Sequence, residues 1–226
     1  MSEFRYELKY ELNQLQYREV LLFLKQQSIQ KKYADRKVNS LYFEKLDFLS
    51  VKENISGQSN RKKIRLRWYN TQNKKPQLEV KIRNGRLGKK TIYELENLSL
   101  KDLEFLNAKE ISKKVFNEIN DKKTNRFFEN NFLFPILKVD YDREYYELKN
   151  NVRITIDSNI NFTYINLSSP LSFNSKMLYN KLIMEIKFSP ESKKDAHGII
   201  KKINLSPSRH SKYLIGISKL GLVKYF

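Results

Sequence analysis

The chain has 226 residues, of which 40% are hydrophobic and 13% aromatic, so it can bury a sizeable core, and wholesale disorder is excluded. Its 44 Lys and Arg residues against 25 Asp and Glu give a net charge of +19, which implies an anionic partner: nucleic acid, anionic lipid or a phosphorylated molecule. The lack of cysteine excludes disulfides, thiolate zinc sites and cysteine nucleophiles.

The elements follow from hydrophobic periodicity. Alternation and β-branched or aromatic content predict strands over residues 4–12, 39–45, 62–69, 77–83, 91–97, 136–148, 152–157 and 182–188. Helical periodicity predicts helices over residues 13–27, with Asn13 as N-cap, and over 100–107, 109–130, 191–203 and 211–220. Strands outnumber helices and do not alternate regularly with them, which argues against a doubly wound sheet. No linker or repeat divides the chain, so the sequence predicts one α+β domain, residues 1–226, on an antiparallel sheet.

The stretch RKKIRLRWYN, residues 61–70, shows the pattern that most strands repeat. Basic side chains occupy alternate positions, and Ile64, Leu66 and Trp68 lie between them, so one face is cationic and the other apolar. Such a face can meet solvent in an open sheet or line the lumen of a closed barrel. Residue statistics alone favour the open sheet, by about two to one.

A series of motifs resembles a known family in order and approximate spacing: FRYELKYEL, SLYFEKLDF, GQSNRKKIRLRWY, LEVKIR, VDYDREYY, VRITID, IMEIKF and SKYLIGI. The chain resembles, from about residue 4 to 220, the catalytic domain of the vacuolar transporter chaperone (VTC) polyphosphate polymerases. These belong to the CYTH, or triphosphate tunnel metalloenzyme, superfamily. The resemblance implies an eight-stranded antiparallel barrel, a tunnel with helices packed on the outside, and it reverses the preference for an open sheet.

The resemblance also implies an activity and a set of site residues. The expected reaction moves the γ-phosphate of ATP onto a growing inorganic polyphosphate chain, with Mn²⁺ or Mg²⁺ as cofactor. The implied phosphate binders are basic residues of the strands and of the last predicted helix: Lys9, Arg65, Arg67, Lys81, Arg143, Arg153, Lys187 and Lys212. Ser211 joins them, Lys63 and Arg61 are weaker candidates on the same face, and Glu185 is the implied metal ligand. Glu7 and Glu79 are interpreted as cross-strand partners of lysines. Asp157 and the two histidines, His197 and His210, are left outside the site.

The sequence departs from the superfamily at its first strand. The superfamily opens with two glutamates and a lysine at alternate positions, whereas this chain has Arg5, Glu7 and Lys9. The loss of the first carboxylate argues against a two-metal triphosphatase. Two alternatives to the polymerase remain: a tunnel triphosphatase, and a non-catalytic module that binds polyphosphate, nucleotide or RNA.

The expected partners are ATP, pyrophosphate and inorganic polyphosphate. A membrane protein encoded elsewhere is a further possible partner. Nucleic acid is not expected, because Tyr6, Tyr10 and Trp68 lie on the face opposite the cations and cannot stack with bases there. Tyr141 and Tyr145 share the face of Arg143 and keep the RNA alternative open. With no signal-peptide-like start and no apolar run long enough to span a membrane, a cytoplasmic protein is expected.

Overall fold

The computed structural model describes residues 5–69, 75–85, 87–119, 133–148, 151–171, 174–208 and 210–223. Its nine strands have the hydrogen-bonded order β1-β9-β7-β6-β2-β3-β4-β5, with β8 (Lys176–Tyr179) paired to β7. The chain divides into two compact units. Unit 1 comprises Met1–Lys37, Tyr141–Ile160 and Leu178–Ser211, and unit 2 comprises Val38–Asp140, Asn161–Met177 and Lys212–Phe226. The long strands β2 (Lys31–Glu44), β6 (Phe134–Glu147) and β7 (Arg153–Tyr164) contribute to both units.

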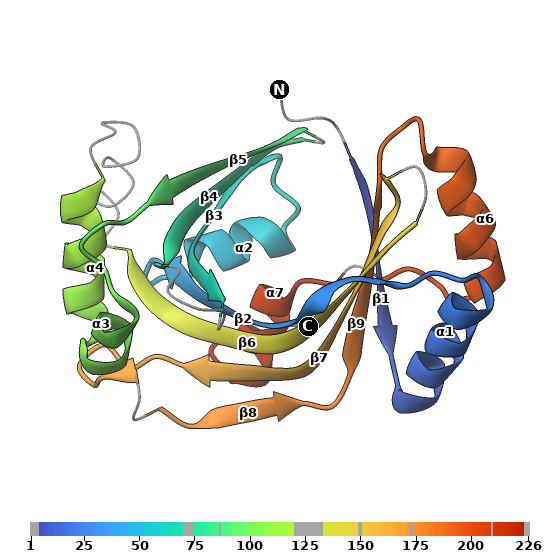
Figure 1. Ribbon diagram of the computed structural model, residues 1–226. Coiled ribbons are helices and arrows are strands. Elements are labelled where there is room, and N and C mark those ends of the chain that lie inside the picture. Colours follow the sequence, from blue (N-terminus) through green and yellow to red (C-terminus); the bar gives the residue numbers. More distant parts are fainter. Residues whose placement is uncertain are drawn as a thin grey trace. The chain divides into compact units, whose positions relative to one another are not determined.

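In unit 1, two helices cover the apolar face of a short antiparallel sheet (Figure 1). Strand β9 (Leu182–Phe188) pairs with β1 (Tyr6–Leu12) on one side and with β7 on the other. Helix α1 (Gln14–Gln26) begins at Asn13, as predicted, and Asn13 and Gln16 form a reciprocal capping box. The stripe that includes Val20 and Leu24 of α1, together with Ile199 of α6 (Lys193–Ile203), packs on the strands. The opposite face of the sheet carries charged side chains, among them Lys9 and Glu185.

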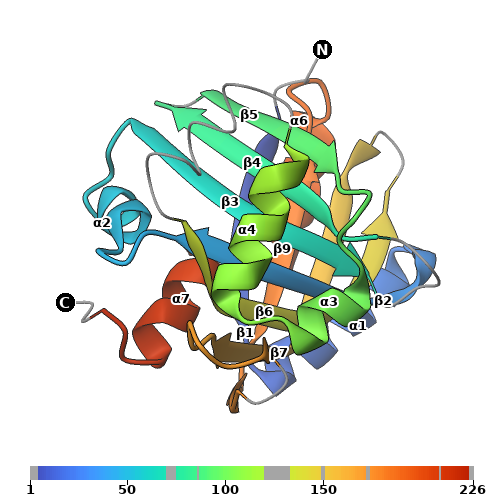
Figure 2. The same cartoon turned by 90° about the vertical axis from the view of Figure 1, so that its left-hand side faces the viewer.

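In unit 2, strand β3 (Asn60–Tyr69) pairs with β2 and with β4 (Gln77–Asn84), which pairs in turn with β5 (Leu87–Glu94). Ile64, Leu66 and Trp68 are buried, and the arginines between them are half-buried on the other face, so the predicted alternation is confirmed. The buried face packs against α3 (Leu100–Phe105) and α4 (Ala108–Glu118), and Figure 2 shows α4 crossing this part of the sheet. Both helices begin at a capping box.

Two further helices belong to unit 2. Helix α2 (Leu49–Ile55) follows β2, and helix α7 (Lys212–Lys219) packs on the part of β6 and β7 that lies in this unit (Figure 1). At Gly216 of α7 a Cβ atom would come within 2.7 Å of Phe162 and 2.9 Å of Leu137. Only a glycine allows this close approach of the helix to the strands.

The predicted α+β class with an antiparallel sheet is confirmed, with local differences. Strand β2 starts at Lys31 rather than at residue 39, β5 covers 87–94 rather than 91–97, and β8 and α2 were not predicted. The predicted helix 109–130 ends at Glu118; its residues 120–130, like residue 4 of the first predicted strand, lie outside the described residues. Among the helices that the structure describes, none has the length and apolar character needed to cross a membrane.

Candidate functional site

The face of β3, β4 and β5 that lies opposite the core of unit 2 carries opposed cations. The register places Lys63 directly across from Lys81, and Lys81 across from Lys90, so three lysines form one row over three strands. The adjoining rows contain Arg65 opposite Glu79, and Arg61 opposite Arg83. Like charges directly opposite each other destabilise a sheet. An anion bound over this face would offset that repulsion.

Glu79 supplies negative charge within this face. Its carboxylate accepts hydrogen bonds from Arg65 Nε (2.8 Å) and Nη2 (2.6 Å) and from Lys90 Nζ (3.0 Å). Burial alone would raise the pKa of Glu79, but the charge and hydrogen bonds of Arg65, with Arg67 and Lys90, lower it to about 2. Glu79 is thus a cross-strand partner of basic residues, as the sequence suggested. It holds Arg65 in a fixed orientation.

This coupling predicts a measurable acid sensitivity. The folded chain keeps Glu79 ionised to about pH 2, whereas the unfolded chain protonates it near 4.5, so its contribution is present above 4.5 and is lost as the pH falls toward 2. The loss should be about 3 kcal/mol of unfolding free energy in urea titrations of the wild type. The Glu79→Gln variant should lack this part of the loss. Identical acid profiles of the two proteins would show that Glu79 is not held ionised by its neighbours.

Tyr42 of β2 is a residue of this face that the sequence analysis did not select. Its hydroxyl accepts a hydrogen bond from Arg65 Nη1 (3.1 Å). Burial alone would raise the pKa of Tyr42, but the charges of Arg65, Arg67 and Lys212 outweigh it and hold the pKa below its ordinary value. The charges of three predicted phosphate binders, two on β3 and one on α7, therefore act on the same tyrosine in unit 2. The alternation within residues 39–45 could have placed Tyr42 on the charged face.

In unit 1 the predicted metal ligand lies among cations. Glu185 of β9 is 6% exposed, and its carboxylate is 2.8 Å from Lys187 Nζ, 3.6 Å from Lys9 Nζ and 3.9 Å from Arg143 Nη2. Lys9 also lies 3.1 Å from Glu7. Within this unit the structure thus brings Lys9, Arg143 and Lys187 together around Glu185.

Arg143 is fixed by a residue that the sequence analysis left out. Asp157 of β7 is fully buried and accepts two hydrogen bonds from Arg143, at Nε (2.6 Å) and Nη2 (2.8 Å). Burial would lower the pKa of Arg143, but Asp157, with Tyr141 and Glu185, raises it well above its ordinary value. Asp157 therefore belongs with the site as the group that orients this guanidinium.

The remaining candidates lie at the margins of these clusters. Arg153 is in register with Lys187, but its side chain is 52% exposed and donates to Glu147 (3.0 Å). Arg61 donates to the Gln58 carbonyl (3.2 Å). Ser211 is partly buried in unit 1 and follows a segment that Lys9 ties to β1: Lys9 Nζ donates to the carbonyl of His210 (3.1 Å), and the Lys9 carbonyl accepts from the Ser208 N–H (2.8 Å).

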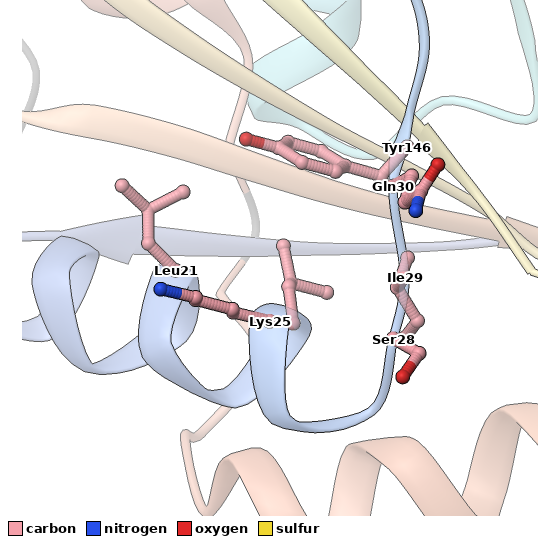
Figure 3. Close-up of a pocket in the computed structure, with 7 residues that line it drawn as sticks. Leu21, Lys25, Ser28, Ile29, Gln30 and Tyr146 are labelled. Carbon is pink, nitrogen blue, oxygen red and sulfur yellow. The ribbon is translucent and has the colours of Figure 1, made fainter.

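A separate hollow of about 360 Å³ lies in unit 1 between α1, the turn that follows it and β6 (Figure 3). Its lining is Leu21, Leu24, Lys25, Ser28, Ile29, Gln30 and Tyr146. None of these is a predicted phosphate or metal ligand, and the leucine and isoleucine walls do not suit a polyanion.

The described residues do not form a ready-made metal cage. Among them no group of three or more His, Asp or Glu side chains is placed to hold an ion. Glu185 offers one carboxylate, which fits an Mg²⁺ or Mn²⁺ ion that takes its other ligands from phosphate oxygens and water. Glu185 therefore fits a divalent ion as one ligand among several.

The same α+β fold occurs in solved structures of low sequence identity. HpAC1 of Hippeastrum, a candidate adenylyl cyclase described as having a dominant triphosphatase activity, has a TM-score of 0.58 at 13% identity over 96% of both chains. A candidate adenylate cyclase from Bacillus halodurans has a TM-score of 0.57 at 13% identity, over 92% of this chain and 94% of that one. The PH1819 protein of Pyrococcus horikoshii OT3 has a TM-score of 0.52 at 16% identity, over 96% and 99%.

The family itself is given by sequence. The VTC domain model matches residues 4–221, nearly the whole chain. The chain belongs to the VTC domain family, and the expected resemblance is confirmed. No curated protein matches it.

Proposed function

We propose that this chain is an ATP-dependent polyphosphate polymerase, which transfers the γ-phosphate of ATP to the end of an inorganic polyphosphate chain. Under this proposal both units form one VTC domain, and the sheet closes into the eight-stranded tunnel of the family with the cationic faces toward its lumen. ATP, pyrophosphate and polyphosphate are the expected ligands, and we place the reaction in the cytoplasm.

The observation that carries the proposal is the lysine row Lys63–Lys81–Lys90 beside the arginine pair Arg65 and Arg67. A row of point charges next to planar, bidentate donors suits a chain of phosphates, since each phosphate brings new oxygens at a regular spacing. A nucleic-acid surface would need exposed aromatic side chains on this face for base stacking. Trp68 instead lies in the core of unit 2.

In phosphoryl transfer the protein mainly aligns the reacting phosphates and neutralises the charge on their oxygens. A terminal phosphate oxygen of the acceptor attacks the γ-phosphorus, the bond from that phosphorus to the β–γ bridging oxygen breaks, and ADP leaves. The attacking oxygen is already deprotonated, so no general base is required. In unit 2, Arg65, Arg67 and Lys81 would bind non-bridging oxygens, and Glu79 would hold Arg65 in place. In unit 1, Arg143 would do the same, held by Asp157.

We assign the metal-binding role to Glu185. A bound Mg²⁺ or Mn²⁺ would neutralise charge that develops on the phosphate oxygens. Lys9, Lys187 and Arg143 lie around the carboxylate, so they would bind oxygens of the phosphate group that accompanies the ion.

A triphosphatase, in which water replaces the acceptor phosphate, is the second candidate. The triphosphatase activity described for the Hippeastrum protein of the same fold favours it. Arg5 in place of the superfamily's first glutamate counts against it.

Product analysis distinguishes the two candidates. With ATP and Mn²⁺ or Mg²⁺, the purified chain should release ADP and form a polymer that resists nucleases and is degraded by an exopolyphosphatase. Orthophosphate as the sole phosphorus product would instead establish the triphosphatase and rule out the polymerase.

A further inference from the structure

A buried carboxylate tethers the first turn of α7 in unit 2. Glu44, the last residue of β2, is fully buried and accepts hydrogen bonds from the backbone N–H groups of Lys45 (2.9 Å) and Ser50 (3.1 Å) and from the hydroxyl of Tyr213. Burial and the negative charge of Glu44 hold the pKa of Tyr213 well above its ordinary value. The hydroxyl therefore remains a donor, and Tyr213 directly follows Lys212 in the chain.

The ring of Tyr213 lies against the cationic face of the same unit. Its centroid is 5.0 Å from that of Tyr42, and the ammonium of Lys63 is 5.5 Å from it. The charge of Lys212 also acts on Tyr42, whose hydroxyl accepts from Arg65. Tyr213 thus connects the buried Glu44 with the group of cations that includes Lys212.

Gly216 provides a second fixed point about one turn along α7. A Cβ atom here would lie within 2.7 Å of Phe162 Cδ1 and 2.9 Å of Leu137 Cδ2, well inside van der Waals contact. The Tyr213 hydroxyl fixes the rotation of α7 about its own axis. Gly216, which has no Cβ, sets how closely the helix approaches the strands.

We propose that Glu44, Tyr213 and Gly216 form a seat for α7 whose function is to position Lys212 for a phosphate chain. This inference rests on the proposed function. Tyr213 and Glu44 are positioning residues: they act on the phosphate through Lys212. If these residues had a purely structural role, mutating them would lower the stability of the protein. The contribution of Lys212 to phosphate affinity would then be unchanged in the folded protein.

A double-mutant cycle on tripolyphosphate binding, measured by calorimetry, tests the seat. Tyr213→Phe keeps the ring against Lys63 and Tyr42 and removes only the tether to Glu44. Tyr213→Phe and Lys212→Ala should each weaken binding, Lys212→Ala by about tenfold, the value of one charge-assisted contact. The double variant should bind no more than about twofold more weakly than Lys212→Ala alone, because the tether acts through that lysine. Additive losses, or wild-type affinity for Tyr213→Phe, would overturn the seat.

Two further variants keep the test decisive. Tyr17→Phe removes a comparable tyrosine–carboxylate hydrogen bond in unit 1, to Glu144 (2.6 Å), and should bind tripolyphosphate like the wild type despite a loss of stability. Gly216→Ala strains the seat and leaves Tyr213 and Glu44 unchanged. It should weaken tripolyphosphate binding when Lys212 is present and add little to the loss in Lys212→Ala. This variant tests the seat if Tyr213→Phe fails to fold. A wild-type protein that does not bind tripolyphosphate would refute the proposed function itself. A wild type that binds, with Lys212→Ala weakened and both seat variants unaffected, would refute the seat alone.

Discussion

Replacing Arg65 or Arg67 with alanine is expected to lower the rate of ADP release from ATP by about a hundredfold or more, because each guanidinium supplies charge-assisted hydrogen bonds to phosphate oxygens. The two arginines alternate with core residues on β3 and share the face of Lys63 and Lys81. Initial rates at saturating ATP and polyphosphate primer measure the effect. Arg65→Lys should recover only part of the rate, since an ammonium cannot reproduce a bidentate contact.

Two comparisons separate catalysis from folding. Arg65→Ala also removes the two hydrogen bonds that Arg65 donates to Glu79, so urea unfolding should show a loss of stability for this variant beside its loss of activity. Lys62→Ala removes a neighbouring cation on the other face, in register with Ile82, and should change the rate little. If Lys62→Ala lowered the rate more than both arginine variants, the reaction would lie on the face opposite Arg65 and Arg67, and the proposed site would be wrong.

Glu185→Gln should reduce turnover to background while changing nucleotide affinity much less. The amide keeps the shape of the side chain but cannot neutralise a divalent cation, and the three cations around it would still bind phosphate. Rates measured over a titration of Mn²⁺, together with nucleotide binding by calorimetry, separate the two effects.

Glu7→Gln is the matched comparison for Glu185→Gln, because Glu7 also contacts Lys9 but is exposed. Its effect should be small at every Mn²⁺ concentration. An unchanged rate of Glu185→Gln at limiting Mn²⁺ would exclude Glu185 as the metal ligand.

The sheet faces were predictable because alternation is a local property. In residues 62–69 and 182–188 each side chain's face follows from its neighbours, and the structure buries Ile64, Leu66, Met184 and Ile186 accordingly. The first half of β2 has few apolar residues and is mostly exposed, so it lacked that signal. Helix α2 was missed because its N-cap, Phe48, has a left-handed backbone and its side chain makes no capping hydrogen bond. Glu44, four residues earlier, accepts the Ser50 N–H instead.

Partners that are far apart in the chain were not predictable from one sequence. The sequence gives no reason to include Asp157 in the site, because its partner, Arg143, is on another strand, 14 residues away. Lys9 was selected as a phosphate binder, but its hydrogen bond to the His210 carbonyl joins positions 201 residues apart. Glu44 and Tyr213 carried no signal for the same reason, since a buried carboxylate and a tyrosine 169 residues away meet only in the fold.

Thermal unfolding in the presence of short polyphosphates tests most directly whether the cationic faces bind phosphate chains. A ligand that binds only the folded chain at a hundredfold excess over Kd adds about 2.7 kcal/mol, which corresponds to a rise in Tm of about 5–10 °C for a chain of this size. Tripolyphosphate should produce this rise at low concentration, and more than an equal ionic strength of chloride. A Tm indifferent to tripolyphosphate but raised by single-stranded RNA, with a steep dependence on salt, would contradict the account and identify a nucleic-acid surface.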